Sequence, residues 1–105
     1  MIYVFDLDGT LCDTDAGNYP AARPIFSRIR FVRQLYEDGH TIIISTARGS
    51  VTGEDWWDLT EQQLLDWDVP YDELYVGRKV FGDIYVDDSA LNAADFFQDG
   101  SDGSV

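Results

Sequence analysis

One six-residue run, Thr41 to Thr46, constrains the fold of this chain more than any other stretch. Its centre, Ile42-Ile43-Ile44, is β-branched and is not interrupted by polar residues. A strand of this kind is buried on both faces, which is typical of a parallel sheet covered by helices. The run therefore predicts an α/β fold.

The rest of the chain alternates between short apolar runs and helical patterns. Strands are expected over 2–6, 41–46, 73–76 and 83–86, a loop over 7–21, and helices from about Pro24 to Gly39, Glu54 to Trp67 and Leu91 to Phe97. The order β-α-β-α-β-β-α predicts a single Rossmann-like, three-layer domain with a mainly parallel sheet and helices on both faces. This domain is expected over residues 1–97, with a flexible acidic tail over residues 98–105.

Charge and composition exclude several classes of protein. The net charge is −13, from 20 acidic and 7 basic residues, whereas binding to duplex nucleic acid usually requires a basic face. The sequence contains no apolar run of about 18 residues that would span a membrane, and its beginning has no basic region typical of a signal peptide. The single Cys12 cannot form an internal disulfide. We therefore expect a cytoplasmic protein without a membrane partner.

The first strand ends in a group of residues that could form a binding or catalytic site. Asp6 and Asp8 alternate at the end of the apolar run, so both carboxylates can point to one side. Gly9 allows the chain to turn there, and Thr10 adds a hydroxyl. A strand followed by an aspartate-rich turn would give the same local pattern. This stretch alone therefore does not decide between a functional site and a purely structural turn.

Two further strand ends resolve that ambiguity. The second strand ends in Thr46, with Arg48 just beyond it, and Asp87-Asp88 follow the last strand. In a parallel sheet, binding sites lie beyond the carboxyl ends of the strands. These side chains are therefore expected to meet at one edge. Four carboxylates in one small volume repel one another, and oxygen ligands favour Mg²⁺ over Zn²⁺.

The chain resembles the haloacid dehalogenase (HAD) superfamily. Asp6-Leu7-Asp8-Gly9-Thr10 is similar to its first motif, the strand ending at Thr46 to its second, Lys79 to its third, and Asp87-Asp88 to its fourth. Two stretches, Thr46-Ala47-Arg48-Gly49 and Asp83-Ile84-Tyr85-Val86-Asp87-Asp88, are more narrowly similar to small members without a cap domain. Those members include capsule-biosynthesis phosphatases and the phosphatase half of phage polynucleotide kinases.

The resemblance implies a role for each matched residue. Asp6 would be the nucleophile that forms an aspartyl-phosphate, and Asp8 would be the general acid and base. Mg²⁺ would be held by the Asp6 carboxylate, the Asp8 carbonyl, Asp87 and, through water, Asp88. Thr46 and Lys79 would complete the catalytic set, and phosphate would be bound by Gly9, Thr10, Thr46, Ala47, Arg48 and Lys79. Tyr19 and Arg23, in the loop before the first helix, are further candidates for contacts with substrate.

An acid at position 8 points, within the superfamily, to phosphatases or phosphomutases. Mutases carry a cap domain, whereas about a dozen residues between Thr10 and the first helix are too few for one. The resemblance therefore implies a capless, Mg²⁺-dependent phosphatase for a small-molecule, sugar or nucleotide phosphate. A polynucleotide 3′-phosphatase and a non-catalytic metal- or phosphate-binding protein are the alternatives. Open sites of this kind take large substrates or are closed by a neighbouring subunit, which leaves an oligomer open.

Overall fold

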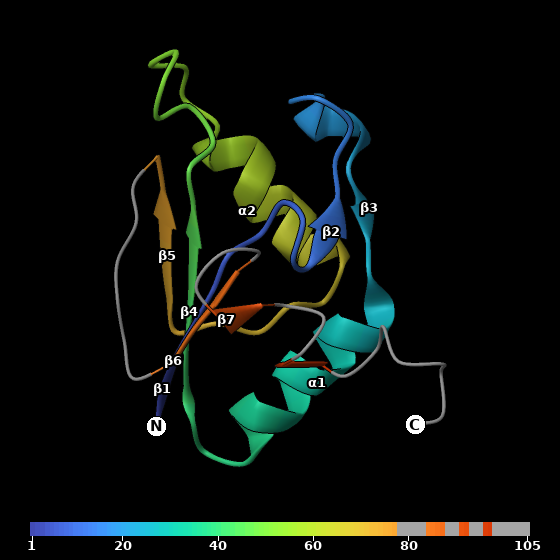
Figure 1. The fold of residues 1–105 in the computed structure, drawn as a ribbon, viewed down its shortest axis with the longest axis vertical. Helices are drawn as coiled ribbons and strands as arrows, with labels where there is room; N and C mark the ends of the chain where they lie inside the picture. The colour runs from blue at the N-terminus through green and yellow to red at the C-terminus, as the bar shows by residue number, and fades with distance from the viewer. Residues whose placement is uncertain (78–83, 88–90, 93–95, 98–105) are drawn as a thin grey trace.

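A parallel sheet forms the centre of the molecule. In the computed structural model, residues 1–77, 84–87, 91–92 and 96–97 are described. The sheet has the order β5-β4-β1-β6-β7, and all its neighbouring strands are parallel (Figure 1). Its strands are β1 (Ile2–Phe5), β4 (Thr41–Thr46), β5 (Glu73–Val76), β6 (Ile84–Asp87) and β7 (Leu91–Asn92). The predicted α/β fold with a mainly parallel sheet is confirmed.

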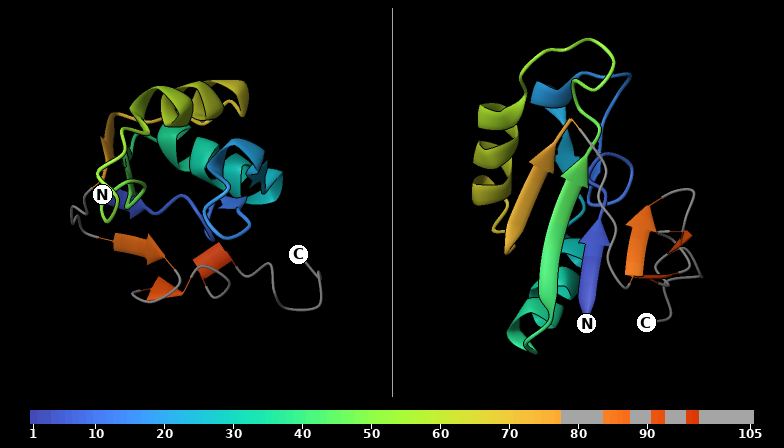
Figure 2. Two further views of the ribbon diagram at one scale, coloured as in Figure 1. Left: turned by 90° about the horizontal axis from the view of Figure 1, so that it is seen from above. Right: turned by 90° about the vertical axis from the view of Figure 1, so that its left-hand side faces the viewer.

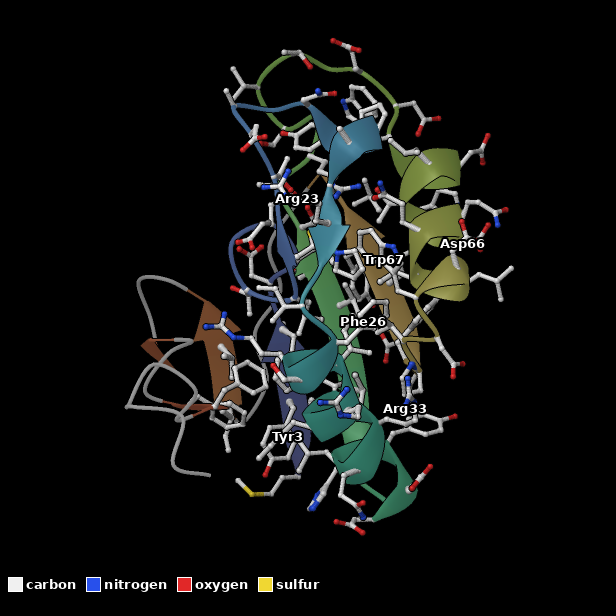
Figure 3. All side chains as sticks on the ribbon, turned by 90° about the vertical axis from the view of Figure 1, so that its right-hand side faces the viewer. Tyr3, Arg23, Phe26, Arg33, Asp66 and Trp67 are labelled. Carbon is white, nitrogen blue, oxygen red and sulfur yellow. The ribbon has the colours of Figure 1, made fainter. Side chains whose placement is uncertain are left out.

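Two helices cover one face of this sheet. They are α1 (Phe26–Glu37) and α2 (Trp57–Asp66), and both lie on the same side of the strands (Figure 2, Figure 3). Ile29 and Val32 of α1 are buried, as is Leu64 of α2. They pack with Phe5 and other strand residues in one apolar core, which stabilises the domain by removing apolar surface from water.

The loop predicted over residues 7–21 contains regular structure. Strand β2 (Cys12–Asp13) pairs antiparallel with β3 (Arg23–Pro24), and a short 3-10 helix, η1 (Tyr19–Ala21), lies between them. We call residues 12–24 the flap. The helix expected from about Pro24 begins two residues later, at Phe26, because Pro24 pairs with Cys12 in the flap. Tertiary pairing of the flap overrides the local preference of proline for a first helical turn.

The expected helix start at Leu91 is wrong. Leu91 and Asn92 pair with Val86 and Asp87 as strand β7, a pairing that no local pattern indicates. Residues 93–95 lie outside the described residues, so the third layer is not described. The boundary at residue 97 and the tail over 98–105 stay predictions. In the part of the chain that is described, no helix is long and apolar enough to cross a membrane.

Candidate active site

The carboxyl ends of three neighbouring strands lie side by side. Phe5 of β1 is opposite Ile44 of β4 and Val86 of β6. The backbone N–H of Asp6 donates to the Val86 carbonyl at 3.0 Å. The same register places the backbone of Asp6 next to that of Asp87, the last residue of β6. The structure brings together the backbone positions that the sequence predicted would meet.

The predicted metal ligands are described only in part. Asp6 is partly buried, and Asp87 ends strand β6, but the side chain of Asp87 is not described. Asp88 and Lys79 lie outside the described residues. Within the described part of the chain, no group of three acidic, histidine or cysteine side chains could hold a metal ion. The predicted metal set stays a prediction.

A tight turn follows Asp8. Gly9 has a φ of +83°, a left-handed conformation that favours glycine. The Gly9 amide donates to the Cys12 carbonyl at 2.8 Å, and the Thr10 amide donates to the Leu7 carbonyl at 3.1 Å. The Thr10 hydroxyl is completely buried and has no partner among the described residues. Phosphate binding by the Gly9 and Thr10 amides would need these bonds to break, so this arrangement does not support that role.

Thr46 ends β4, and the arrangement of its hydroxyl suits the predicted contact with a phosphate oxygen. It is 1% exposed, and its hydroxyl oxygen accepts a hydrogen bond from the Arg48 backbone N–H at 3.3 Å. Accepting that bond leaves the hydroxyl proton available to a phosphate oxygen. Ala47, the next residue, is exposed at the same strand end. Their contacts with phosphate stay predictions.

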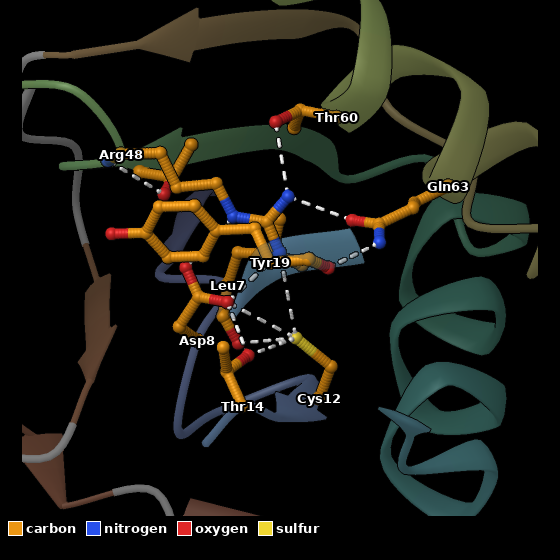
Figure 4. A network of polar contacts seen from close by, with 9 residues as sticks. Leu7, Asp8, Cys12, Thr14, Tyr19, Arg48, Thr60 and Gln63 are labelled. Atoms are coloured by element: carbon orange, nitrogen blue, oxygen red, sulfur yellow. Dashed lines mark hydrogen bonds and ion pairs between the residues drawn. The ribbon is translucent and has the colours of Figure 1, made fainter. Parts of the chain in front are cut away.

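Asp8 and Arg48 form a bidentate ion pair (Figure 4). The Arg48 Nε donates to Asp8 Oδ2 at 2.9 Å, and Nη2 donates to Asp8 Oδ1 at 2.8 Å. The Arg48 side chain is completely buried, and that of Asp8 is 25% exposed. Thr14 donates to Asp8 Oδ1 at 2.5 Å, and the Cys12 thiol contacts the same oxygen at 3.5 Å. The Asp8 carboxylate is therefore held in one orientation.

The remaining donors of Arg48 are also engaged. Its Nη1 donates to Thr60 Oγ1 at 3.1 Å and to Gln63 Oε1 at 2.7 Å, and Nη2 reaches Cys12 Sγ at 4.0 Å. These contacts and the two to Asp8 account for all five N–H groups of a guanidinium. In this arrangement Arg48 has no donor left for the phosphate that the sequence assigned to it. It orients Asp8 instead.

The contacts of Asp8 change the pKa of its carboxyl. Burial alone would raise the pKa of the Asp8 carboxyl, but hydrogen bonds from Arg48 and Thr14, together with the charge of Arg48, lower it below its usual value. Burial chiefly, with the nearby Asp8 charge, raises the pKa of the Cys12 thiol to about 12. Cys12 therefore stays protonated at neutral pH, as expected of a packed thiol, because only the thiolate is a nucleophile.

The flap covers this network. The Tyr19 ring lies 4.7 Å from the Arg48 guanidinium carbon and makes an edge-on contact with Trp56, with ring centres 5.0 Å apart. Arg23 instead points to Asp15, at 3.3 Å, on an exposed part of the flap. Tyr19 therefore lies next to the predicted acid–base residue. Contacts of Tyr19 or Arg23 with substrate stay predictions.

The polar residues that hold Arg48 were not among the site residues predicted from the sequence. Thr60 and Gln63 both lie on the inner side of α2, beside the apolar Leu64. Positions 60, 63, 64 and 67 form one helical face, so a glutamine inside this stripe signals a buried polar group that needs a partner. That signal indicates burial, but it does not identify Arg48 as the partner.

Solved structures similar to this chain were found, whereas no family model and no curated protein matches it. A Vibrio cholerae protein, an MCSG target, is 30% identical and superposes with a TM-score of 0.73, over 92% of this chain and 88% of that one. A chain of the Pnkp1/Rnl/Hen1 RNA repair complex is 17% identical, with a TM-score of 0.66 over 97% of this chain and 40% of that one. The D,D-heptose 1.7-bisphosphate phosphatase of B. bronchiseptica, complexed with magnesium and phosphate, is 15% identical, with a TM-score of 0.54 over 71% of this chain and 48% of that one. This chain spans less than half of the latter two, and those likenesses concern the fold alone.

Proposed function

Because the chain belongs to the family of the Vibrio cholerae protein and has a HAD-like Rossmann-type fold, we propose that it is a Mg²⁺-dependent phosphatase of phosphate monoesters. The observation that carries this proposal is the alignment of strand ends. Asp6 follows β1, Thr46 ends β4 and Asp87 ends β6, at one edge of the sheet. Sites of parallel α/β folds lie at this edge.

In the proposed reaction, an Asp6 carboxylate oxygen attacks phosphorus, and the bond to the leaving alkoxide breaks. Asp8 gives a proton to that alkoxide and then takes one from the water that hydrolyses the aspartyl-phosphate. The lowered pKa of Asp8 keeps the carboxyl ionised, as the second role requires. The first role needs a proton that Asp8 takes up as the anionic substrate enters, because nearby negative charge raises the pKa of a carboxyl. Thr46 donates to a phosphate oxygen.

The chemistry of the donor set suits magnesium. Carboxylate and carbonyl oxygens are the ligands of hard cations, and the Asp8 carboxylate is occupied by Arg48, which leaves its carbonyl as the ligand that the resemblance implies. Asp6, the Asp8 carbonyl and Asp87 would hold the ion, with Asp88 in support through water. Bound Mg²⁺ would neutralise charge on the transferring phosphoryl group. Lys79 would act in the same way.

The direct test is hydrolysis of p-nitrophenyl phosphate by the full chain with Mg²⁺. We expect turnover that EDTA abolishes and that added Mg²⁺ restores. Asp6→Asn should lower kcat by at least about 10³-fold, since an amide cannot replace the carboxylate nucleophile of the proposed covalent intermediate. Asp38→Asn is the matched control, because Asp38 is exposed between α1 and β4, at the opposite edge of the sheet. Metal-independent turnover, or an active Asp6→Asn variant, would contradict the proposed mechanism, whereas no turnover at all in the parent chain would favour a binding protein.

The substrate class within this proposal is a small-molecule, sugar or nucleotide phosphate, supported by the net charge of −13. The likeness in fold to a chain of an RNA repair complex favours a second candidate, a polynucleotide 3′-phosphatase. Phosphate release should be compared among sugar phosphates, mononucleotides and 3′-phosphorylated single-stranded oligonucleotides. The preferred class is the one with the highest kcat/KM. A higher kcat/KM for the oligonucleotide would make the polynucleotide 3′-phosphatase the better assignment.

A further inference from the structure

The side chain of Gln63 joins two separate parts of the molecule. It is buried in α2, with 7% of its surface exposed. Its Oε1 accepts from Arg48 Nη1 at 2.7 Å, and its Nε2 donates to the Tyr19 carbonyl oxygen at 2.7 Å. A guanidinium only donates and a carbonyl only accepts, so these two partners determine which way the amide faces. Figure 4 shows the chain of contacts from Gln63 through Arg48 to Asp8.

We propose that Gln63 is a positioning residue for the acid–base step, an inference that rests on the proposed phosphatase function. The contacts described for Gln63 are with Arg48 and Tyr19, not with Asp8. Gln63 acts by holding the guanidinium of Arg48 on the side away from Asp8.

The geometry of arginine transmits this effect. The guanidinium is planar and rigid, so fixing Nη1 also fixes the plane of Nε and Nη2. Those two nitrogens donate hydrogen bonds to the two carboxylate oxygens of Asp8. Without Gln63, Nη1 retains only Thr60, and the plane can tilt. A tilt displaces the Asp8 carboxyl from the leaving oxygen, and small displacements of a catalytic group are costly.

Gln63 also holds the flap against the same guanidinium. The Tyr19 carbonyl accepts the Gln63 amide, while the Tyr19 ring lies over the Arg48 guanidinium. The guanidinium therefore has α2 at one end, the flap on its face and Asp8 at its other end. The buried amide of Gln63 therefore holds both Arg48 and the Tyr19 segment of the flap.

The test uses Gln63→Met, which keeps the length of the side chain and removes both hydrogen bonds. Gln62→Met is the matched control, because Gln62 is the adjacent residue of the same helix and is exposed, with its amide bonded only to Asp66 among the contacts described. Both variants and the parent chain, with Mg²⁺, are assayed on a series of phosphate monoesters from p-nitrophenyl to alkyl. Good leaving groups need little protonation, whereas alkoxides need the acid.

We expect Gln63→Met to lower kcat by about 10 to 100-fold on an alkyl phosphate and by less than about 3-fold on p-nitrophenyl phosphate. The dependence of rate on leaving-group basicity should become steeper, in the same direction as in Asp8→Asn and to a smaller extent. Gln62→Met should match the parent on both substrates. The midpoint of thermal unfolding is measured for each variant, and assays are run well below it.

Thr60→Val provides a milder variant that is nearly isosteric. It removes the second acceptor of the same Nη1, and it should give a selective loss of the same sign if Gln63→Met does not fold. An equal loss on all substrates in both variants would overturn the inference and leave the phosphatase proposal intact. Absence of turnover in the parent chain with Mg²⁺ would overturn the proposed function, and this inference with it.

Discussion

At the scale of single residues, the buried pair of Asp8 and Arg48 connects stability with the proposed chemistry. Removing one partner of such a pair leaves an uncompensated buried charge, which is far more costly than losing both partners together. Arg48 is 1% exposed. Its other contacts, to Thr60 and Gln63, do not neutralise its charge. The stability of the domain should therefore depend on what stands at position 8.

Asp8→Ala should destabilise the fold much more than Asp8→Asn. Alanine leaves the Arg48 charge without a partner, at a cost of about 3–5 kcal/mol, whereas asparagine retains one acceptor oxygen. Urea unfolding of both variants measures the difference in unfolding free energy. Arg48→Met in the Asp8→Ala background should restore part of the lost stability. Equal stability of the two single variants would contradict the burial of the charge.

The same pair predicts how stability depends on pH. The pKa of Asp8 is lowered in the folded state, so its ionised form stabilises the fold above the unfolded pKa of about 3.9. This contribution is lost as pH falls from there through the folded pKa. The difference in unfolding free energy between the parent and Asp8→Asn should be constant between about pH 5 and 7 and should shrink below about pH 4. A difference that grows as the pH falls would show that the pKa is not lowered.

At the scale of elements, the flap and the connection from β4 to α2 bring the network together. The flap supplies Cys12, Thr14 and Tyr19, and α2 supplies Thr60 and Gln63. The connection between β4 and α2 passes over the site and contains two glycines with positive φ, Gly49 at +83° and Gly53 at +79°. A side chain at Gly49 would meet the Glu54 backbone oxygen at 2.1 Å, whereas one at Gly53 would meet nothing within 4 Å. The absence of a side chain at Gly49 therefore allows the backbone at position 49 to approach that of Glu54 within the same connection.

Gly49→Ala should destabilise the domain and Gly53→Ala should do so much less. At Gly53 the cost is that of a left-handed alanine, about 1–2 kcal/mol. At Gly49 the backbone must also move, which shifts Trp56 and the adjacent Tyr19. The midpoint of thermal unfolding measures stability, and tryptophan fluorescence reports the shift. If the two variants unfold at the same temperature, the close approach at Gly49 is not required.

At the scale of the whole molecule, the charge of −13 opposes the approach of an anionic substrate. The electrostatic field of these charges is screened over a Debye length of about 30 Å at 0.01 M ionic strength and about 8 Å at 0.15 M. Negative charges distributed over the surface therefore repel a phosphate dianion most strongly at low salt.

Raising NaCl from about 0.01 M to 0.15 M at saturating Mg²⁺ should therefore increase kcat/KM for a phosphate monoester, mainly by lowering KM. We expect kcat to change little, because the site's own contacts are partly buried and weakly screened. Steady-state kinetics at several salt concentrations provide the measurement. A kcat/KM that falls with salt would show that local cations, rather than the net charge, control the approach of substrate.

The sequence by itself determined the parallel sheet, both described helices and the edge at which the strand ends meet. Their signals are local, because β-branched runs, helical stripes and an Asp-x-Asp at a strand end are read within a few residues. Tertiary structure alone decided that β7 and the flap form, and that Arg48 binds Asp8. The network around Arg48 depends on partners far apart in the sequence, such as Asp8 and Arg48, Arg48 and Gln63, or Gln63 and Tyr19. A buried arginine takes the carboxylate that packing brings to it, because leaving its charge unpaired would cost more than giving up a contact with substrate.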